Sequence, residues 1–420
     1  GDTGYHKVEE RMTMNDTELN RRNFIKKGLT GLAAVGAVPG ALKATAFGAA
    51  GTGQAATAAA KPIIRTLGKT GLKIPVVSMG VMNADNPAVV EAALESGIVM
   101  LDTAHGYQRG RNEQMIGEVI KGRARDTFMI ATKVPGPNRD RNLQALTGEP
   151  LQKAFLDMFD VSLRRLGLDH VEILYLHNNS APEHVRNADI IEALQKAKKA
   201  GKARFVGIST HASEPAVIRS TIEAKAYDVI LTAYNFKQDH RNEVRKAVAE
   251  AAAAGLGVVA MKTQAGGYWD KERLQPINML AALKWVLNDT NVTTAIPGFT
   301  TFDQLKEDLP AMTDLTLTAD DLKSLRLGEQ VAGLYCQQCG QCLAGCPKGL
   351  PIPDLMRSYM YAYGYRSLQT AHELVVSLDV PENPCGSCAS CTAVCAKGFD
   401  IADRVRDICR LRAVPGDFFA

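Results

Sequence analysis

The first 335 residues contain no cysteine, and all nine cysteines of the 420-residue chain lie in its last 85 residues. A disulfide framework normally spreads through a secreted fold or fills a small one. This distribution therefore argues against a fold stabilised by disulfides. It indicates instead a metal site confined to the C-terminal end of the chain.

The net charge of the chain is also low. The formal charge is only +4, so nothing in the balance of charges favours nucleic acid or an anionic membrane as a partner. The chain is 46% hydrophobic and 22% charged, which is an ordinary globular composition. Its length allows two or three domains, each able to bury a core.

Residues 28–60 have no acidic side chain and are rich in Ala, Gly and Thr. The stretch RRNFIKK precedes them at 21–27, and the two together resemble a twin-arginine signal peptide, with Ile25 as a conservative departure. The apolar run is too short and too interrupted to span a membrane comfortably. We therefore interpret residues 1–60 as an N-terminal extension with a twin-arginine signal, and expect export to the periplasm or another extracytoplasmic compartment. A disordered tail is the alternative.

Residues 61–330 alternate between short β-prone runs and amphipathic helical stretches, after an opening hairpin pattern, IIRTLGKTGLKIP. Eight such units in about 250 residues predict an α/β fold of the TIM barrel type. A doubly wound open sheet is the alternative, but no G-x-G-x-x-G follows the first strand. The strands are expected at 74–81, 99–104, 127–134, 171–178, 203–210, 228–235, 256–263 and 292–299.

Four titratable residues fall at or just after the C-terminal ends of neighbouring predicted strands, where the chemistry of such barrels is located. They are Asp102, Tyr107, Lys133 and His177. A tyrosine hydroxyl has a pKa of about 10, and a nearby ammonium group favours its ionised form. An aspartate can anchor that lysine, and a histidine can orient a carbonyl oxygen. The set suits protonation of a carbonyl group as a hydride reaches its carbon.

The motifs LDTAHGY, ATKV and LGLDHVEILYLH resemble the catalytic tetrad motifs of the aldo-keto reductases, and the resemblance covers roughly residues 62–328. It implies that Tyr107 is the proton donor and that Lys133 modulates its pKa. It also implies that Asp102 is the partner of the lysine and that His177 orients the carbonyl.

The same resemblance implies a nicotinamide cofactor, NADP(H) or NAD(H), with a preference for NADP that rests only on family habit. The pattern departs from the family at Leu231, where Gln is usual, and at Gly298 and Gln304, where cations often bind a 2′-phosphate. Loss of nicotinamide binding therefore stays open. The expected cofactor residues are Gly80, Val81, Met82, Asp102, Ser209, Thr210, Met261, Lys262, Gln264, Gly298, Thr300, Gln304 and Asp308.

The cysteines form two copies of C-x2-C-x2-C-x3-C, the run associated with four-iron ferredoxin clusters. In two-cluster proteins the fourth cysteine of each run binds the other cluster. One [4Fe-4S] cluster is therefore assigned to Cys336, Cys339, Cys342 and Cys395, and the second to Cys385, Cys388, Cys391 and Cys346. Zinc sites and disulfides are the alternatives. The remaining Cys409 is expected to be a buried, inert thiol.

The segment between the two runs has helical patterns, so residues 331–420 resemble the α-helical ferredoxin modules of multi-subunit redox enzymes. We expect an oxidoreductase that interconverts a carbonyl and an alcohol and carries two clusters for electron transfer. Its expected partners are a small-molecule substrate, a redox protein and the twin-arginine export machinery, which carries folded cargo. The alternatives are an electron-transfer subunit whose barrel is a docking or ligand-binding scaffold, and clusters with a structural role.

Overall fold

The computed structural model describes residues 61–327 and 333–419. The predicted twin-arginine signal lies outside the described residues. Within them, no helix combines the length and the apolar character that crossing a membrane requires.

Eight parallel strands form one sheet, and each strand pairs with the next along the chain. Two isolated parallel bridges, Val77 to Ala295 and Gly80 to Gly298, join the first strand to the last and close the sheet. The predicted TIM barrel is thus confirmed, and the open sheet was the wrong alternative. The strands are β3 (Met79–Gly80), β4 (Met100–Asp102), β5 (Met129–Pro135), β6 (Val171–Asn179), β7 (Ala203–Thr210), β8 (Val229–Ala233), β9 (Gly257–Met261) and β10 (Thr294–Ala295).

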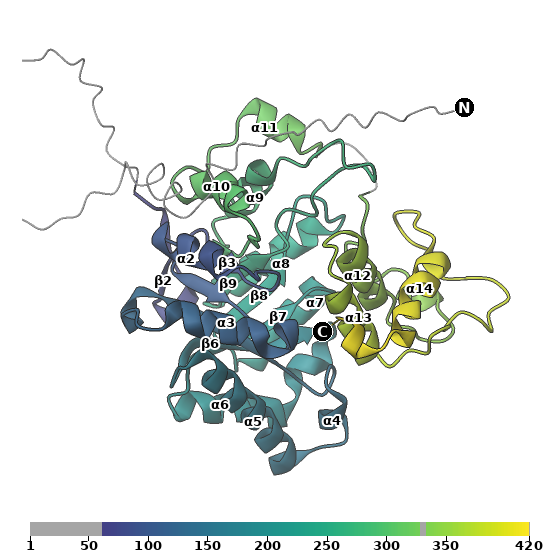
Figure 1. The fold of residues 1–420 in the computed structure, drawn as a ribbon, viewed down its shortest axis with the longest axis horizontal. Helices are drawn as coiled ribbons and strands as arrows, with labels where there is room; N and C mark the ends of the chain where they lie inside the picture. The colour runs from purple at the N-terminus through teal and green to yellow at the C-terminus, as the bar shows by residue number, and fades with distance from the viewer. Residues whose placement is uncertain (1–60, 328–332, 420) are drawn as a thin grey trace, which may run out of the picture. The chain divides into compact units, whose positions relative to one another are not determined.

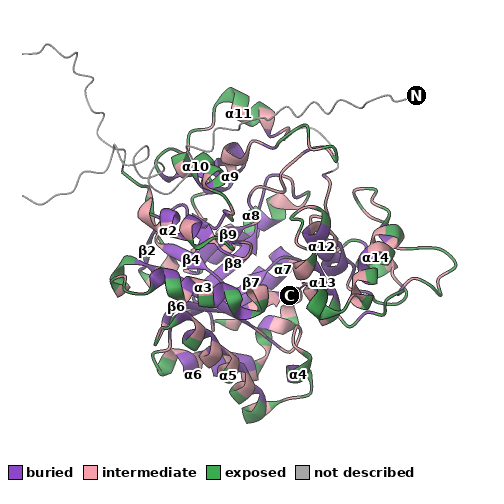
Figure 2. Ribbon diagram, in the orientation of Figure 1, coloured by how far each residue is buried: buried purple, intermediate pink, exposed green. Residues whose placement is uncertain are grey.

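Helices surround these strands, and the buried residues concentrate on the strands and on the inner helix faces (Figures 1 and 2). Local signals set several helix ends: the Asn86 side chain accepts a hydrogen bond from Ala88 N, and Gly167 ends a helix in the left-handed conformation. The helices are α2 (Pro87–Glu95), α3 (Arg111–Ile120), α4 (Arg141–Gln144), α5 (Gly148–Leu166), α6 (Ala188–Lys199), α7 (Glu214–Ala224), α8 (Arg241–Ala253), α9 (Met279–Leu287), α10 (Phe302–Asp308) and α11 (Ala319–Ser324).

The opening hairpin closes one end of the barrel. Its strands β1 (Ile64–Thr66) and β2 (Lys73–Pro75) pair antiparallel, so the first predicted barrel strand, 74–81, begins too early. Leu67 of the hairpin packs into the barrel interior against Gly257, at the start of β9. Because this end is filled, the C-terminal ends of the strands form the only mouth of the described barrel.

The C-terminal region is helical, as predicted, and has its own apolar core. It contains α12 (Ile352–Tyr363), α13 (Leu368–Ser377) and α14 (Ile401–Cys409). Leu355, Val375 and Val405 are fully buried in this core, and Met82 of the barrel packs against it. The region and the barrel belong to one compact unit, residues 62–420.

Candidate active site and cluster-binding region

The four predicted catalytic residues meet at the barrel mouth. Lys133, on β5, forms a salt bridge with Asp102 at the end of β4, and both side chains are almost fully buried. The Lys133 ammonium also donates to Thr103 O at 2.6 Å and to the Tyr107 hydroxyl at 3.3 Å. The ring of His177, on β6, lies edge-on to that of Tyr107, with 5.8 Å between their centres. The structure therefore brings together all four residues, which the sequence placed at or just after the ends of three neighbouring strands.

The pKa of Tyr107 departs from the expectation. Burial raises it more than the Lys133 ammonium lowers it, so the net shift is upward and the hydroxyl stays protonated near neutral pH. The pKa of His177 lies well below its usual value, first through burial and then through the charges of Lys133, Arg139 and Arg357. A neutral imidazole and a protonated phenol can both donate a hydrogen bond to a carbonyl oxygen.

A strained turn follows Tyr107. Gln108, Arg109 and Gly110 all have positive φ, which is costly for the first two because they carry side chains. Contacts at both sides hold the turn: Gln108 donates to the carbonyls of Met82 and Ala84, each at 3.1 Å, and Arg109 forms a salt bridge of 3.0 Å with Glu373 of α13. The C-terminal region thus supports the backbone that carries Tyr107.

The predicted cofactor residues beside β7 are already hydrogen-bonded within the protein. The Ser209 hydroxyl accepts from Asn178 N at 2.8 Å, and the Thr210 hydroxyl donates to Ala212 O at 2.9 Å. Asn179 donates to Ser209 O, but its own amide oxygen is buried without a partner. A carboxamide of nicotinamide would find an acceptor there, from a residue that the sequence did not single out.

Other predicted cofactor residues line the barrel interior or its rim. Met261 is buried in the apolar barrel core, together with Leu231, which was identified as a departure from the expected cofactor pattern. A Cβ added to Gly80 would lie 2.9 Å from Ile296 O, so glycine is needed where β3 approaches β10. Val81 N donates to Asp102 O at 3.0 Å, and Met82 is covered by the C-terminal core.

Five further predicted residues follow β9 or β10, and four of them form two hydrogen-bonded pairs. Gln264 donates to the buried Asp308 carboxylate at 2.6 Å, and Gln304 accepts from Thr300 N at 2.8 Å. Burial raises the pKa of Asp308 to about 7, and its second oxygen has no partner. Gly298, beside β3, adds no side chain. A buried carboxylate fits ribose hydroxyls better than a phosphate, because like charges repel.

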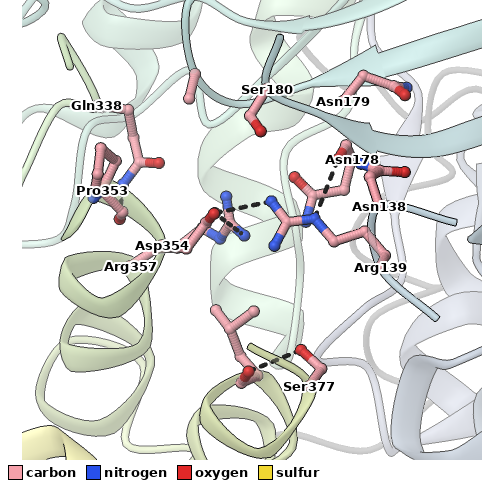
Figure 3. Close-up of polar contacts among 12 residues, drawn as sticks. Asn138, Arg139, Asn178, Asn179, Ser180, Gln338, Pro353, Asp354, Arg357 and Ser377 are labelled. Carbon is pink, nitrogen blue, oxygen red and sulfur yellow. Dashed lines mark hydrogen bonds and ion pairs between the residues drawn. The ribbon is translucent and has the colours of Figure 1, made fainter. Parts of the chain in front are cut away.

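Residues of α12 reach the mouth of the barrel, which the sequence did not predict. Arg139, in the loop after β5, forms a salt bridge of 2.9 Å with Asp354 of α12, and Arg357 binds the same carboxylate at 2.7 Å (Figure 3). With its amide rotated, Asn178 accepts from Arg357 at 3.0 Å and from Arg139 at 3.2 Å. The only sequence signal was an acidic and a basic residue one helical turn apart.

Lys262 also faces α12. Its ammonium lies over the rings of Tyr361 and Tyr365, 5.2 and 5.7 Å from their centres. Charges of Lys262 and Arg357 outweigh burial and lower the pKa of Tyr361, which is itself almost fully buried. A second lysine–tyrosine pair thus lies opposite Lys133 and Tyr107.

The nine cysteines are all free thiols, so the disulfide alternative is not realised. Burial raises the pKa of Cys336 to about 12, and the thiols of Cys339, Cys342 and Cys395 add to the shift. The thiols of Cys388, Cys391 and Cys346 likewise raise the pKa of Cys385, after burial. Cys346, assigned to the second set, also raises the pKa of Cys342 of the first set, so the influences among the thiols do not separate the two predicted ligand sets.

Backbone amides point at two of these sulfurs: Gln338 N donates to Cys336 Sγ at 3.3 Å, and Lys397 N donates to Cys395 Sγ at 3.4 Å. In the described ranges, no three His, Cys, Asp or Glu side chains are close enough to hold a single metal ion. A four-iron cluster binds each thiolate through a different iron, so its ligands lie further apart. The donor chemistry and the arrangement fit such clusters better than zinc.

Cys409 belongs to neither of the two predicted ligand sets. It is fully buried, and burial first, then Cys385, raises its pKa to about 12. The predicted burial is confirmed, and a thiol with this pKa is a poor nucleophile.

Comparison with known proteins agrees with both regions. Residues 78–281 match the aldo/keto reductase family, and residues 335–400 match a 4Fe-4S dicluster domain. The chain therefore carries an aldo/keto reductase domain and a 4Fe-4S dicluster domain. This finding supports assignment of the chain to the oxidoreductases.

The relatives described below cover about three fifths of this chain and most of their own length. An uncharacterized oxidoreductase, YqkF of Bacillus subtilis, is 25% identical over 296 residues, which cover 62% of this chain and 95% of the relative. The L-galactose dehydrogenase of Arabidopsis thaliana is 26% identical over 302 residues, covering 62% and 92%. The holo form of an aldo-keto reductase from Bacillus halodurans has a TM-score of 0.52 and 28% identity, covering 63% of this chain and 95% of that structure.

Proposed function

We propose that the protein is a nicotinamide-dependent oxidoreductase that interconverts a carbonyl and an alcohol, with Tyr107 as the acid–base residue. The observation that carries the proposal is the buried Lys133 ammonium, bound to Asp102 and 3.3 Å from the Tyr107 hydroxyl. Four titratable residues from three neighbouring strands and the turn after one of them have no simpler reason to converge at the mouth of the barrel.

Each residue has a role that follows from its environment. Tyr107 is protonated and transfers its proton to the carbonyl oxygen, while Lys133 stabilises the tyrosinate that forms. Neutral His177 donates a hydrogen bond to the same oxygen and orients it. Asp102 keeps Lys133 in place. Bound nicotinamide supplies or accepts the hydride.

Residues at two places would hold the nucleotide. Ser209 and the unpartnered amide oxygen of Asn179 suit the carboxamide group. The unpartnered oxygen of Asp308 suits a ribose hydroxyl and disfavours a 2′-phosphate, because a carboxylate and a phosphate repel each other. We therefore infer that NADH binds at least as tightly as NADPH, although family habit favoured NADP.

The cysteine sets would hold two [4Fe-4S] clusters that exchange electrons with a redox partner protein. Support comes from the two complete runs and from the backbone amides directed at Cys336 and Cys395. Export by the twin-arginine route fits this cargo, because clusters are inserted in the cytoplasm and the protein must then cross the membrane folded. The location outside the cytoplasm is part of the proposal.

The decisive experiment replaces Tyr107 with Phe and follows NADH-dependent reduction of small carbonyl compounds by the reconstituted protein. We expect turnover to fall about 100-fold or more, since a positioned general acid contributes that much. Tyr227→Phe is the matched control: its hydroxyl is buried and bonded to Val185 O at 2.8 Å, away from the mouth. Equal turnover in Tyr107→Phe and the intact protein would refute the proposed chemistry.

An electron-transfer subunit with a scaffold barrel is the second candidate. It is favoured by the apolar Leu231, which cannot bind a carboxamide, and by the cover that α12 places over the mouth. Absence of binding of either nucleotide in calorimetry would support it.

A further inference from the structure

The C-terminal region contributes a cation to the barrel mouth. The Arg357 side chain is only 2% exposed, and one of its guanidinium nitrogens, Nη1, is buried without a hydrogen-bond partner. Its charge lowers the pKa of His177, which lies near the C-terminal end of β6, and of His211, which directly follows β7. Arg357 therefore faces the site where the carbonyl group is expected.

The barrel contributes a second cation, Lys262, directly after β9. Its backbone has a positive φ of 55°, and Asn235 donates to its carbonyl oxygen at 3.1 Å, which holds this unusual conformation. No described carboxylate forms a salt bridge with Lys262; tyrosine rings surround its ammonium instead. Its charge also lowers the pKa of His211, so it acts on the same space as Arg357.

The charges at the mouth do not balance. The mouth holds four cations and two carboxylates: Lys133 pairs with Asp102, Arg139 and Arg357 share Asp354, and Lys262 has no carboxylate partner among the described residues. Two positive charges are left over among these described groups. Buried charge without a counter-charge is costly, so a ligand with an anionic group would be favoured here.

We propose that the substrate is an anionic carbonyl or hydroxy compound, and that Arg357 and Lys262 hold its carboxylate or phosphate group beside Tyr107. This inference rests on the proposed function and names its substrate class. In the reductive direction a C–H bond forms at the carbonyl carbon from the hydride of NADH, which is oxidised. The carbonyl oxygen takes the proton of Tyr107, which water restores.

Binding of the nucleotide or of the clusters would explain the excess positive charge at the mouth less well than an anionic substrate does. The region suited to the far ribose of the nucleotide carries a carboxylate, Asp308. The cluster cysteines Cys336 and Cys395 accept from backbone amides, Gln338 N at 3.3 Å and Lys397 N at 3.4 Å, and no hydrogen bond from a cation of the mouth reaches either sulfur among the described residues. Arg357 and Lys262 act instead on His177, His211 and Tyr361.

The test compares charged and neutral substrates of similar shape: phenylglyoxylate with its methyl ester, and glyceraldehyde 3-phosphate with glyceraldehyde. In Arg357→Gln and Lys262→Gln we expect KM for the anionic member of one pair to rise about 10-fold or more, as for loss of a buried charge pair. KM for its neutral partner should stay unchanged in both variants, and Kd for NADH should stay unchanged in Arg357→Gln. The pair that responds identifies carboxylate or phosphate.

Arg412→Gln is the control for the charge of the C-terminal region, because Arg412 pairs with the exposed Asp379 at 3.2 Å. Lys262→Gln removes no salt bridge between the described residues. An effect of this variant on KM is therefore not explained by a folding defect. Equal effects on charged and neutral substrates, no effect on either, or weaker NADH binding in both variants would overturn the inference.

Failure of the proposed function can be told apart from failure of this inference. If the intact protein reduces neutral carbonyls through Tyr107 and does not prefer anions, only the substrate class is wrong. If it reduces nothing, calorimetric binding of phenylglyoxylate and glyceraldehyde 3-phosphate still tests the anion site. Binding that is lost in both Gln variants would sustain the inference, and absence of binding to the intact protein would contradict it.

Discussion

The two chemical regions of the molecule are built in opposite ways. The barrel site takes one residue from each of several strands, and its side chains are buried and hydrogen-bonded before any ligand arrives. The C-terminal region draws its candidate ligands from two short runs, and most of these thiols are partly buried, with Cys391 exposed. The first site is organised by the fold, whereas the second needs its metal to be complete.

The largest effect should come from removing one predicted cluster ligand in the C-terminal region. Cys388→Ala removes one ligand of the set Cys385, Cys388, Cys391 and Cys346, whereas Cys409→Ala removes the thiol assigned no metal. We expect iron in the reconstituted protein to fall from about eight to about four atoms per chain in the first variant only. Iron analysis and visible absorbance measure this. Loss of iron in Cys409→Ala, or none in Cys388→Ala, would contradict the ligand assignment.

The next effect concerns the contact between the regions. Asp354→Asn leaves Arg139 and Arg357 buried without their shared carboxylate, so we expect the free energy of unfolding to fall by about 3–5 kcal/mol. Asp379→Asn is the matched control, because Asp379 is 64% exposed and should contribute less than about 1 kcal/mol. Chemical denaturation of both variants gives the values. Similar losses in the two would mean that the buried group does not join the regions.

The next prediction concerns the pH dependence of stability that the buried Asp308 of the barrel should cause. Its pKa is raised to about 7 from an unfolded value of 3.8, so the folded state binds more protons between these values. Stability should therefore fall as pH rises from about 4 to about 7. Asp308→Asn should remove that slope and gain at most about 4 kcal/mol at pH 8. Denaturation at a series of pH values checks this.

Asp314→Asn provides the contrast for that series. Hydrogen bonds from Thr316 and the nearby Lys284 lower the pKa of Asp314 to about 2. Its contribution is thus present above pH 4 and is lost as pH falls towards 2, which is the opposite sign. A slope that persists between pH 4 and 7 in Asp308→Asn would show that another group causes it.

The smallest expected effect tests the support that the C-terminal region gives to Tyr107. Arg109→Gln removes the salt bridge to Glu373 and should lower kcat about 2- to 10-fold, because the catalytic hydroxyl loses some of its orientation. Lys121→Gln is the control, since Lys121 pairs only with the exposed Glu118 of its own helix at 3.5 Å. Steady-state kinetics compare the two. An unchanged kcat in Arg109→Gln would mean that the strained turn holds by itself.

Much of this organisation follows from sequence patterns. Eight repeated units specify a barrel, and polar residues at strand ends meet because parallel strands end at one rim; hence Asp102, Lys133 and His177 were identifiable. The cysteine runs are local, so they needed no fold at all. The first strand was placed too early because Ile74 is apolar in either setting.

What could not be predicted depends on contacts between distant segments. Arg139 and Arg357 are separated by more than 200 residues and meet only because α12 packs over the mouth. The direction in which the pKa of Tyr107 shifts likewise depends on how deeply the hydroxyl is buried, and no sequence motif specifies that burial. The free amide oxygen of Asn179 results from the irregular pairing of β6 and β7 at this point.

One measurement tests the central claim most directly: anaerobic titration of the reconstituted protein with NADH and NADPH, followed by nucleotide binding and by cluster absorbance. A hydride carries two electrons, and two clusters take one electron each. The account predicts binding, at least as tight for NADH, together with bleaching of the clusters. Binding without bleaching would separate the barrel chemistry from the clusters, and no binding of either nucleotide would contradict a nicotinamide-dependent oxidoreductase.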